Sequence, residues 1–382
     1  MPKLYKNTVF YTLLMGLVAW ACINPIKDFV QVDATSFTTI EADISDDAAL
    51  SKVRLTSSSN RLTSQFSLPI SKATVYVTDQ NGVKTTFTEG TPTGTYYPST
   101  GFKGVVGSSY KLSVQLLTGK SYESAVETMK AVPEIENLIT RFEILDQYSK
   151  VDIRRAGFSV YLDFKDFQNE GDFYLWNWKH FEKIRLCATC TDGGRYDFKK
   201  LDCVQPRFPN DAILNYMCDG NCWDISTNND LNVFSDVLTN GQRVVGRQVA
   251  RIPFDNWTPY YFRLEQRSIT RSAYAFYQSL ISQIQSSGSL FDVPAETRFS
   301  LNIKSTTNPT EKVIGIFNVF SVKKKIFIID RSKDIPVGEL PIIPTVLGET
   351  YTCPPGSVGC QEKVPCMESN TRTKITPEGW VF

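Results

Sequence analysis

The residue best suited to chemistry in this sequence is Cys22, which stands at the end of a short N-terminal apolar stretch. Lys3 and Lys6 make the N-terminus positive, and the apolar run over residues 9–21 has the length of a signal peptide rather than of a membrane span. A cysteine directly after such a run is typical of a bacterial lipobox, in which the thiol becomes a thioether to a diacylglycerol. We therefore expect residues 1–21 to be removed as a lipoprotein signal peptide, and Cys22 to carry palmitate-type chains that anchor the protein to a membrane.

Two alternatives to lipidation stay open at this point, namely an ordinary cleaved secretory peptide and an uncleaved anchor. Ala19 stands where a lipobox usually has leucine, and Trp20 is bulky where a small residue is usual. If the lipobox functions, residues 22–35 form a tether between the lipid and the folded part of the chain.

The other eight cysteines of the nine are expected to form disulfides. Eight is an even number, and an exported protein meets an oxidising compartment in which all eight thiols can pair. The candidates are Cys187, Cys190, Cys203, Cys218, Cys222, Cys353, Cys360 and Cys366. The spacings 187–190 and 218–222 are also compatible with zinc ligands or a redox-active pair, so these alternatives remain, and the connectivity stays open.

The three cysteines near the C-terminus, Cys353, Cys360 and Cys366, are an odd number. At least one of them must then pair outside its own segment if all are oxidised. We predict a disulfide between this tail and the loop at 187–222, so that the Cys- and Pro-rich tail at 341–382 packs against the second domain.

No pattern in the sequence indicates an active site, and we expect no enzyme, no cofactor and no bound metal. His180 is the only histidine, which disfavours His-based catalysis, and it is expected to be partly buried or on the surface. Four acidic residues lie close together and could suggest a hydrolase, but they are interpreted as a solvated loop. They are Asp163, Asp166, Glu170 and Asp172. Asp219, Asn221 and Asp292 could contact calcium, although the spacing of a known calcium loop is absent.

The aromatic residues are mostly expected in the core, with four tryptophans as candidates for a carbohydrate or peptide groove. Trp176, Trp178, Trp223 and Trp257 lie in segments of mixed polarity, which favours a surface position. Lysine plus arginine is 41 and aspartate plus glutamate is 40, so the chain lacks the basic excess of a nucleic-acid-binding protein.

These residues must be positioned by a mainly β protein. Short alternating segments from 36 to 132, with Asn81-Gly82 as a hairpin turn, predict an immunoglobulin- or transthyretin-like sandwich. A larger β-rich domain is expected over 133–340, with the disulfide-rich loop as an insertion and one prominent helix near 271–286 that Thr270 can cap. The triple lysine at 323–325 is interpreted as a solvated turn or as a charged guard on an edge strand.

Several short stretches, in a fixed order, resemble those of a known family. They are residues 70–75, 122–124, 132–135, 267–270, 288–294, 302–303, 308–309 and 313–317, with Met129 and the cysteine loop. Together they make the chain similar to the family catalogued as domain of unknown function 4249, which are cell-envelope lipoproteins of Bacteroidota. The resemblance implies an outer-membrane location, on the periplasmic or the surface face, and a TonB-dependent transporter as partner. It implies no catalytic residues.

The functional expectation is therefore a non-enzymatic binding or accessory lipoprotein that helps such a transporter to capture its substrate. A surface adhesin or structural protein is the first alternative, because it would share the anchor and the fold. A polymer-degrading hydrolase is the second.

Overall fold

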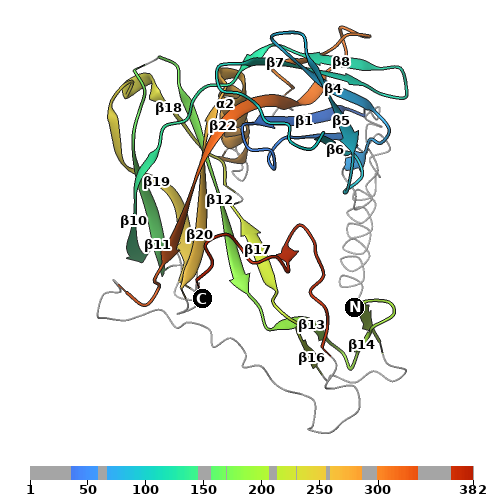
Figure 1. Cartoon of the computed structure of the whole chain (residues 1–382), viewed down its shortest axis with the longest axis vertical. Helices are drawn as coiled ribbons and strands as arrows, with labels where there is room; N and C mark the ends of the chain where they lie inside the picture. Colours follow the sequence, from blue (N-terminus) through green and yellow to red (C-terminus); the bar gives the residue numbers. More distant parts are fainter. Residues whose placement is uncertain are drawn as a thin grey trace, which may run out of the picture.

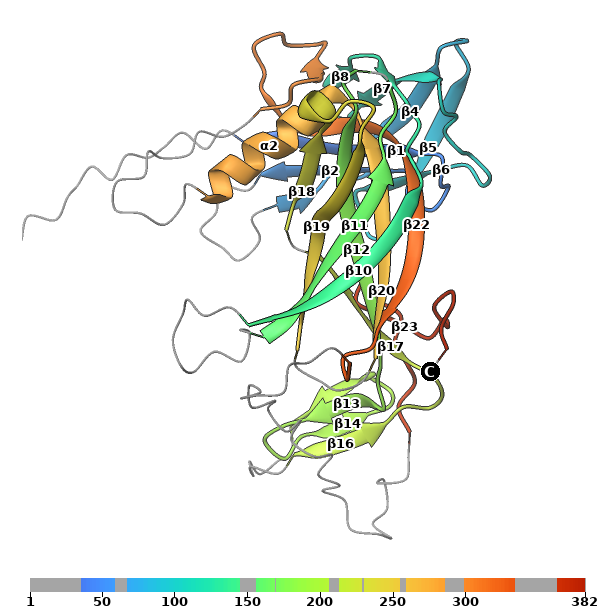
Figure 2. The ribbon, with the colours of Figure 1, turned by 90° about the vertical axis from the view of Figure 1, so that its left-hand side faces the viewer.

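The protein is described by a computed structural model, and its predicted fold class is confirmed: it is mainly β, and the residues that the structure describes contain one α-helix and, in a cysteine-rich region, three disulfides (Figures 1 and 2). The structure describes residues 36–58, 67–144, 156–168, 170–205, 213–228, 230–254, 259–285, 299–333 and 363–381. In Figure 1 the N-terminal lobe lies at the upper right and the second lobe lies to its left and below it. The cysteine-rich module lies at the lower end of both views, away from the N-terminal lobe.

The N-terminal lobe is a sheet of short strands that encloses a single core. Its strands are β1 (Thr38–Ser45), β2 (Lys52–Ser58), β3 (Ser67–Pro69), β4 (Thr74–Asp79), β5 (Lys84–Glu89), β6 (Thr95–Pro98), β7 (Ser109–Gln115), β8 (Ser121–Ser124) and β9 (Glu127–Thr128). The hydrogen-bonded path runs β8-β7-β4-β5-β6-β2-β1. Side chains from both ends of this path, including Ile40, Val53, Val75 and Leu112, are buried against one another, as in a sandwich.

The predicted hairpin is confirmed as β4 and β5, which pair antiparallel around Asn81-Gly82. Gly82 has a φ of +81°, a conformation that glycine adopts without steric cost. The Asp79 carboxylate accepts hydrogen bonds from the backbone N–H groups of Asn81 and Val83, both at 2.9 Å, and so holds the turn.

Residues from late in the chain complete the N-terminal lobe. β21 (Ile303–Ser305) pairs antiparallel with β8, and β22 (Val313–Ile329) begins by pairing parallel with β1. The segment 36–132 therefore does not supply all the strands of this sheet.

The second lobe has two sheets packed face to face. One contains β10 (Ile135–Ile144), β11 (Ala156–Lys165) and β19 (Arg243–Pro253). The other contains β12 (Phe173–Lys183), β17 (Trp223–Thr227), β18 (Asn232–Ser235), β20 (Tyr260–Ile269), the second half of β22, and β23 (Arg372–Thr373). Phe158 and Leu162 of the first sheet share one core with Trp176 and Phe262 of the second.

The triple lysine at 323–325 lies within a strand, so the predicted turn between two strands is wrong. β22 is continuous for 17 residues, and Lys323, Lys324 and Lys325 pair with β20. Their ammonium groups contact Glu134, Asp47 and the carbonyl oxygens of Ile135 and Glu136, respectively. Long lysine side chains can leave a half-buried strand and reach such partners, so three adjacent charges do not interrupt it.

The predicted helix is α2 (Arg271–Gln285), and it lies beside β12, β18 and β22 where the two lobes meet (Figure 2). The Thr270 hydroxyl accepts a hydrogen bond from the Ala273 N–H at 3.4 Å, in the manner of an N-cap. Phe276 and Ala273 face the core, and the Tyr274 ring stacks on Phe173 at 4.7 Å between centroids. In the part of the chain that the structure describes, no helix is long and apolar enough to cross a membrane.

Candidate functional site

The cysteine module is built from two small hairpin-like sheets. β13 (Leu186–Cys190) pairs with β16 (Leu214–Met217), and β14 (Arg195–Asp197) pairs with β15 (Asp202–Val204). Two disulfides bind these strands together, Cys187–Cys218 and Cys190–Cys203. The small core around Cys190, Tyr216 and Val364 would be too little to hold such a module by itself, so the covalent links replace apolar burial.

A third disulfide, Cys222–Cys366, joins the tail to this module, which is the kind of link that the odd number of tail cysteines predicted. The tail also hydrogen-bonds along the module, because the Val364 N–H donates to the Met217 carbonyl and the Asp219 N–H donates to the Val364 carbonyl. Cys353 and Cys360 lie outside the described residues, as does the lipidation candidate Cys22.

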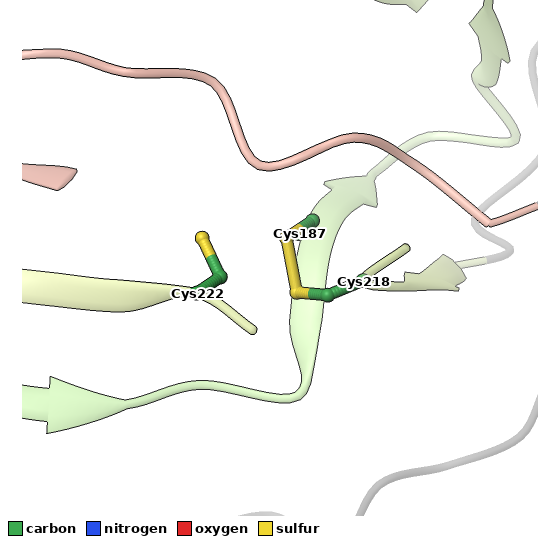
Figure 3. A group of neighbouring side chains, drawn as sticks. All are labelled: Cys187, Cys218 and Cys222. Carbon is green, nitrogen blue, oxygen red and sulfur yellow. A yellow bond between two sulfur atoms is a disulfide. The ribbon is translucent and has the colours of Figure 1, made fainter. Parts of the chain in front are cut away.

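Cys222 lies beside the Cys187–Cys218 disulfide (Figure 3). The sulfur of Cys222 lies within 4.8 Å of those of Cys187 and Cys218, which is close enough for ligands of one metal ion. In the structure, however, each of the three sulfurs is in a disulfide, and zinc requires thiolates. The zinc alternative therefore applies only to a reduced chain.

The expected surface position is wrong for two of the four tryptophans. Trp176 and Trp223 are 0% and 1% exposed, and the Trp176 indole N–H donates to the Gln266 side chain at 2.9 Å. The mixed polarity around Trp176 comes from strand alternation, because its neighbours along β12 point to the other face of the sheet. Trp178 is half-buried at the margin of the second-lobe core, and Trp257 lies outside the described residues.

The acidic residues at 163–172 do not form a solvated loop, although Glu170 is exposed. Asp166 and Asp172 are only 2% and 3% exposed. The Tyr174 hydroxyl donates to Asp166, and the Lys130 ammonium contacts Asp172 at 2.8 Å. Asp163 accepts the Gly246 N–H at 2.8 Å, which lowers the pKa of its carboxyl. Asp163, Asp166 and Asp172 therefore have structural partners, which sequence spacing alone did not reveal.

His180 is buried and held on three sides. Its ring stacks on Tyr260 at 3.6 Å between centroids, Nδ1 lies 2.8 Å from the Tyr261 carbonyl oxygen, and Nε2 lies 2.9 Å from Glu182. Asp219 and Asn221, the calcium candidates in the cysteine module, are exposed, and Asp292 lies outside the described residues.

Trp178 opens onto a polar groove of about 360 Å³, which is our candidate ligand site. The groove lies between β12, the β17–β18 connection and β19. Its lining is Trp178, Asn228, Asp230, Asn232, Arg247, Gln248, Val249, Ala250 and Arg251. An indole beside amides and guanidinium groups can stack on a ring and bind hydroxyl, amide or carboxylate groups.

Hydrogen bonds fix the walls of this groove. The Asn228 side-chain oxygen accepts a hydrogen bond from the backbone N–H of Trp178 at 3.0 Å. Its amide nitrogen donates to the backbone carbonyl of Asp230 at 2.8 Å. Arg247 donates to Asn232 at 2.6 Å, and the Asn232 amide donates to the Gln248 carbonyl at 3.0 Å. Such a pre-formed site loses little entropy when a ligand binds. Sequence reasoning selected Trp178 but missed the arginines, because they come from a strand about 70 residues away.

A second, more apolar cleft of about 790 Å³ lies beside α2. Phe173, Phe234, Tyr274 and the short 3-10 helix η2 (Asp236–Leu238) form its walls. Val237 and Leu238 are 76% and 93% exposed at its rim. Only Arg271 brings charge to the lining, so this cleft is suited to apolar groups.

The family described as Domain of unknown function (DUF4249) matches residues 24–326 of this chain. The match therefore spans both lobes, the groove, the apolar cleft and the cysteines at 187–222, and it stops within β22. Among curated proteins, none matches the sequence.

Proposed function

The chain belongs to the DUF4249 family, and from that premise we propose that it is a lipid-anchored outer-membrane protein that binds a ligand without transforming it. In this proposal it is the accessory of a TonB-dependent transporter, to which it passes the captured substrate. The polar groove beside Trp178 is the observation that carries the binding role, and Cys22 carries the anchor.

The groove favours a ligand with flat or ring-shaped parts and several polar groups, such as an oligosaccharide or a short peptide. Trp178 offers an apolar face, while Asn228, Asn232 and Arg251 surround it with hydrogen-bonding groups. Sugars and peptides present that combination, whereas a fully apolar ligand would leave the polar lining without partners.

A non-catalytic role is supported by the carboxylates at 163–172. Glycoside hydrolysis needs two carboxyl groups that face each other across a substrate. Here Asp163 is tied to the backbone of Gly246, and Asp166 and Asp172 are buried against Tyr174 and Lys130. None of these three carboxylates lines the polar groove.

Binding in the groove is tested with arrays of oligosaccharides and short peptides. We expect the wild-type protein to retain a defined subset, and Trp178→Ala to weaken that binding about tenfold or more, because stacking on the indole is lost. Phe198→Ala removes an exposed aromatic residue from the cysteine module and serves as the control. Equal binding by wild type and Trp178→Ala would reject the groove as the site.

The anchor is tested by metabolic labelling with palmitate. The wild-type chain should incorporate label and partition with membranes, while Cys22→Ser should incorporate none and leave the membrane fraction. Label that persists unchanged in Cys22→Ser contradicts lipidation at this position.

The adhesin or structural alternative has one specific observation in its favour, which is the apolar cleft with Val237 and Leu238 at its rim. Protruding apolar side chains favour contact with another protein. Replacing both residues by serine should then abolish partner binding and leave ligand binding in the groove intact.

A further inference from the structure

Five buried side-chain oxygens near the start of β12 have no hydrogen-bond partner among the described residues. They are Asp172 Oδ2, Asp236 Oδ1, Asp236 Oδ2, Thr239 Oγ1 and Asn240 Oδ1. Buried polar atoms are almost always paired, because leaving one unpaired destabilises the fold, and a charged one does so more strongly. Five such oxygens on two adjoining segments indicate that a ligand of some kind belongs there.

The residues that carry these oxygens lie on two chain segments. The segment 166–172 connects β11 to β12, and the segment 236–242 connects β18 to β19. They are hydrogen-bonded to each other at three places: the Asp236 N–H donates to the Asp172 carbonyl at 3.1 Å, the Gly241 N–H to Phe167 at 2.9 Å, and the Asp166 N–H to Gln242 at 3.0 Å. We call this junction the acidic corner.

The acidic corner contains three deeply buried carboxylates. Asp236 is 0% exposed, and Asp166 and Asp172 are nearly as deeply buried. Asp166 has the Tyr174 hydroxyl and the Gly241 N–H as donors, and Asp172 has Lys130 on one oxygen. Within the described part of the chain, Asp236 has no such donor on either carboxylate oxygen. A buried carboxylate anion needs a cation or hydrogen-bond donors beside it.

The chemistry of the five unpaired oxygens favours a hard cation over a transition metal. All five are oxygens, from two carboxylates, a hydroxyl and an amide, and Ca²⁺ takes such ligands in flexible arrangements. Where the chain is described, only cysteines form a ready cluster of three acidic, histidine or cysteine ligands. The ion would therefore rely on two carboxylates and complete its shell with neutral oxygens, which suits Ca²⁺ better than the small, rigid shell of Mg²⁺.

We propose that the acidic corner is a calcium site, in which Asp236, Asp172, Thr239 and Asn240 provide ligands and Asp166 lies behind them. The ion would tie η2 to the start of β12, and both of these elements also form walls of the apolar cleft. This inference does not depend on the ligand of the polar groove or on the transporter.

The competing explanation is that no ion binds at the acidic corner, and the two explanations give opposite results. The full chain is freed of metal with a chelator, and Ca²⁺ binding is measured by titration calorimetry and by the thermal unfolding midpoint. We expect one calcium per chain and a midpoint raised by about 2–4 °C at saturating Ca²⁺, with a smaller rise in Mg²⁺. Asp236→Asn should weaken calcium binding at least about tenfold and remove the rise.

Two further variants make the test specific. Asp219→Asn, in the exposed sequence Asp219-Gly220-Asn221, is the matched control and should bind calcium as wild type does. Asn240→Leu removes a neutral ligand without changing charge, and it covers the case in which Asp236→Asn fails to fold. Absence of calcium binding in wild type, an equal effect of Mg²⁺, or wild-type calcium binding by both Asp236→Asn and Asn240→Leu would overturn the proposal.

Discussion

At the scale of single residues, buried polar side chains of the second lobe hold its strands and the junction between the lobes in place. Gln266 is 0% exposed, accepts the Trp176 indole N–H, and donates to the Pro133 carbonyl at 2.8 Å. It thereby fixes the junction between the lobes by hydrogen bonds rather than by apolar contact. Glu265, its neighbour, points to the other face of the same strand, where Arg263, Arg267 and Lys179 surround it.

Glu265 yields a prediction about pH. Burial works to raise the pKa of Glu265, but the nearby Arg267, at 2.7 Å, and Lys179 outweigh it and leave the pKa below its ordinary value of 4.5. A carboxyl group with a lowered folded-state pKa stabilises the fold above 4.5, and this stability is lost as the pH falls through the folded-state pKa. Glu265→Gln should therefore lower the free energy of unfolding by about 2–4 kcal/mol at neutral pH and by much less at about pH 3.

Urea unfolding of wild type and Glu265→Gln at the two pH values measures this difference. Glu170→Gln, at an exposed position, should change the unfolding free energy little at either pH. A difference between wild type and Glu265→Gln that stays constant or grows on acidification would contradict the assignment.

At the scale of elements, the sequence predicted those turns and helix ends that depend on residues a few positions apart. The hairpin of β4 and β5 and the start of α2 could be predicted because turn and cap residues act over a few positions. The pairing of β21 with β8 and of β22 with β1 could not, because both join segments more than 170 residues apart. The turn predicted at residues 323–325 was wrong for the same reason. The three lysines stay within β22 because their ammonium groups contact partners on distant segments, which the sequence does not reveal.

The disulfides give a prediction at this scale. The Cys222–Cys366 bond closes a loop of 144 residues, whereas Cys190–Cys203 closes one of 13. Replacing Cys222 and Cys366 by alanine together should cost about 2–4 kcal/mol and expose the tail to protease, because the long loop gains most freedom in the unfolded chain. The double alanine variant at 190 and 203 is the control, and it should lose less stability and keep the tail protected.

Equal loss of stability in both double variants would show that loop length does not determine their effect. Continued protection of the tail without Cys366 would show that the hydrogen bonds of Val364 with Met217 and Asp219 suffice to hold it.

At the scale of the whole molecule, β22 joins the two lobes into one structure. Its first half pairs with β1 of the N-terminal lobe, and its second half pairs with β20 of the second lobe. Gly315 allows the first contact. Its φ is +105°, and a Cβ atom there would lie 2.1 Å from the Ile40 carbonyl oxygen. The two lobes should therefore unfold together rather than one after the other.

Gly315→Ala tests this coupling. We expect a loss of about 3 kcal/mol or more, from backbone strain and from the clash with Ile40, and the loss should affect both lobes. Gly246→Ala is the control: its φ of +67° is also positive, but no atom lies within 4 Å of the added Cβ. Calorimetry that resolves separate transitions for the two lobes in wild type, or equal losses in the two variants, would contradict the coupling.

The candidate site could be predicted only in part, because most of it is formed by segments far apart in the sequence. A half-exposed aromatic residue such as Trp178 can be suspected from its local sequence. The groove, however, exists only because β19 brings Arg247 and Arg251 beside it, and the acidic corner exists only because residues 236–242 fold over residues 166–172. Contacts between distant segments depend on the fold and leave no periodic signal in the sequence.

We propose that this protein works with a TonB-dependent transporter, and co-purification tests that proposal most directly. Membranes from cells that carry the chain with a C-terminal affinity tag are extracted in mild detergent, and the captured proteins are identified by mass spectrometry. We predict that the wild-type chain recovers a TonB-dependent transporter in near-equal amount, and that Cys22→Ser recovers little. Recovery of the lipidated wild-type chain alone, without any such transporter, would contradict the claim.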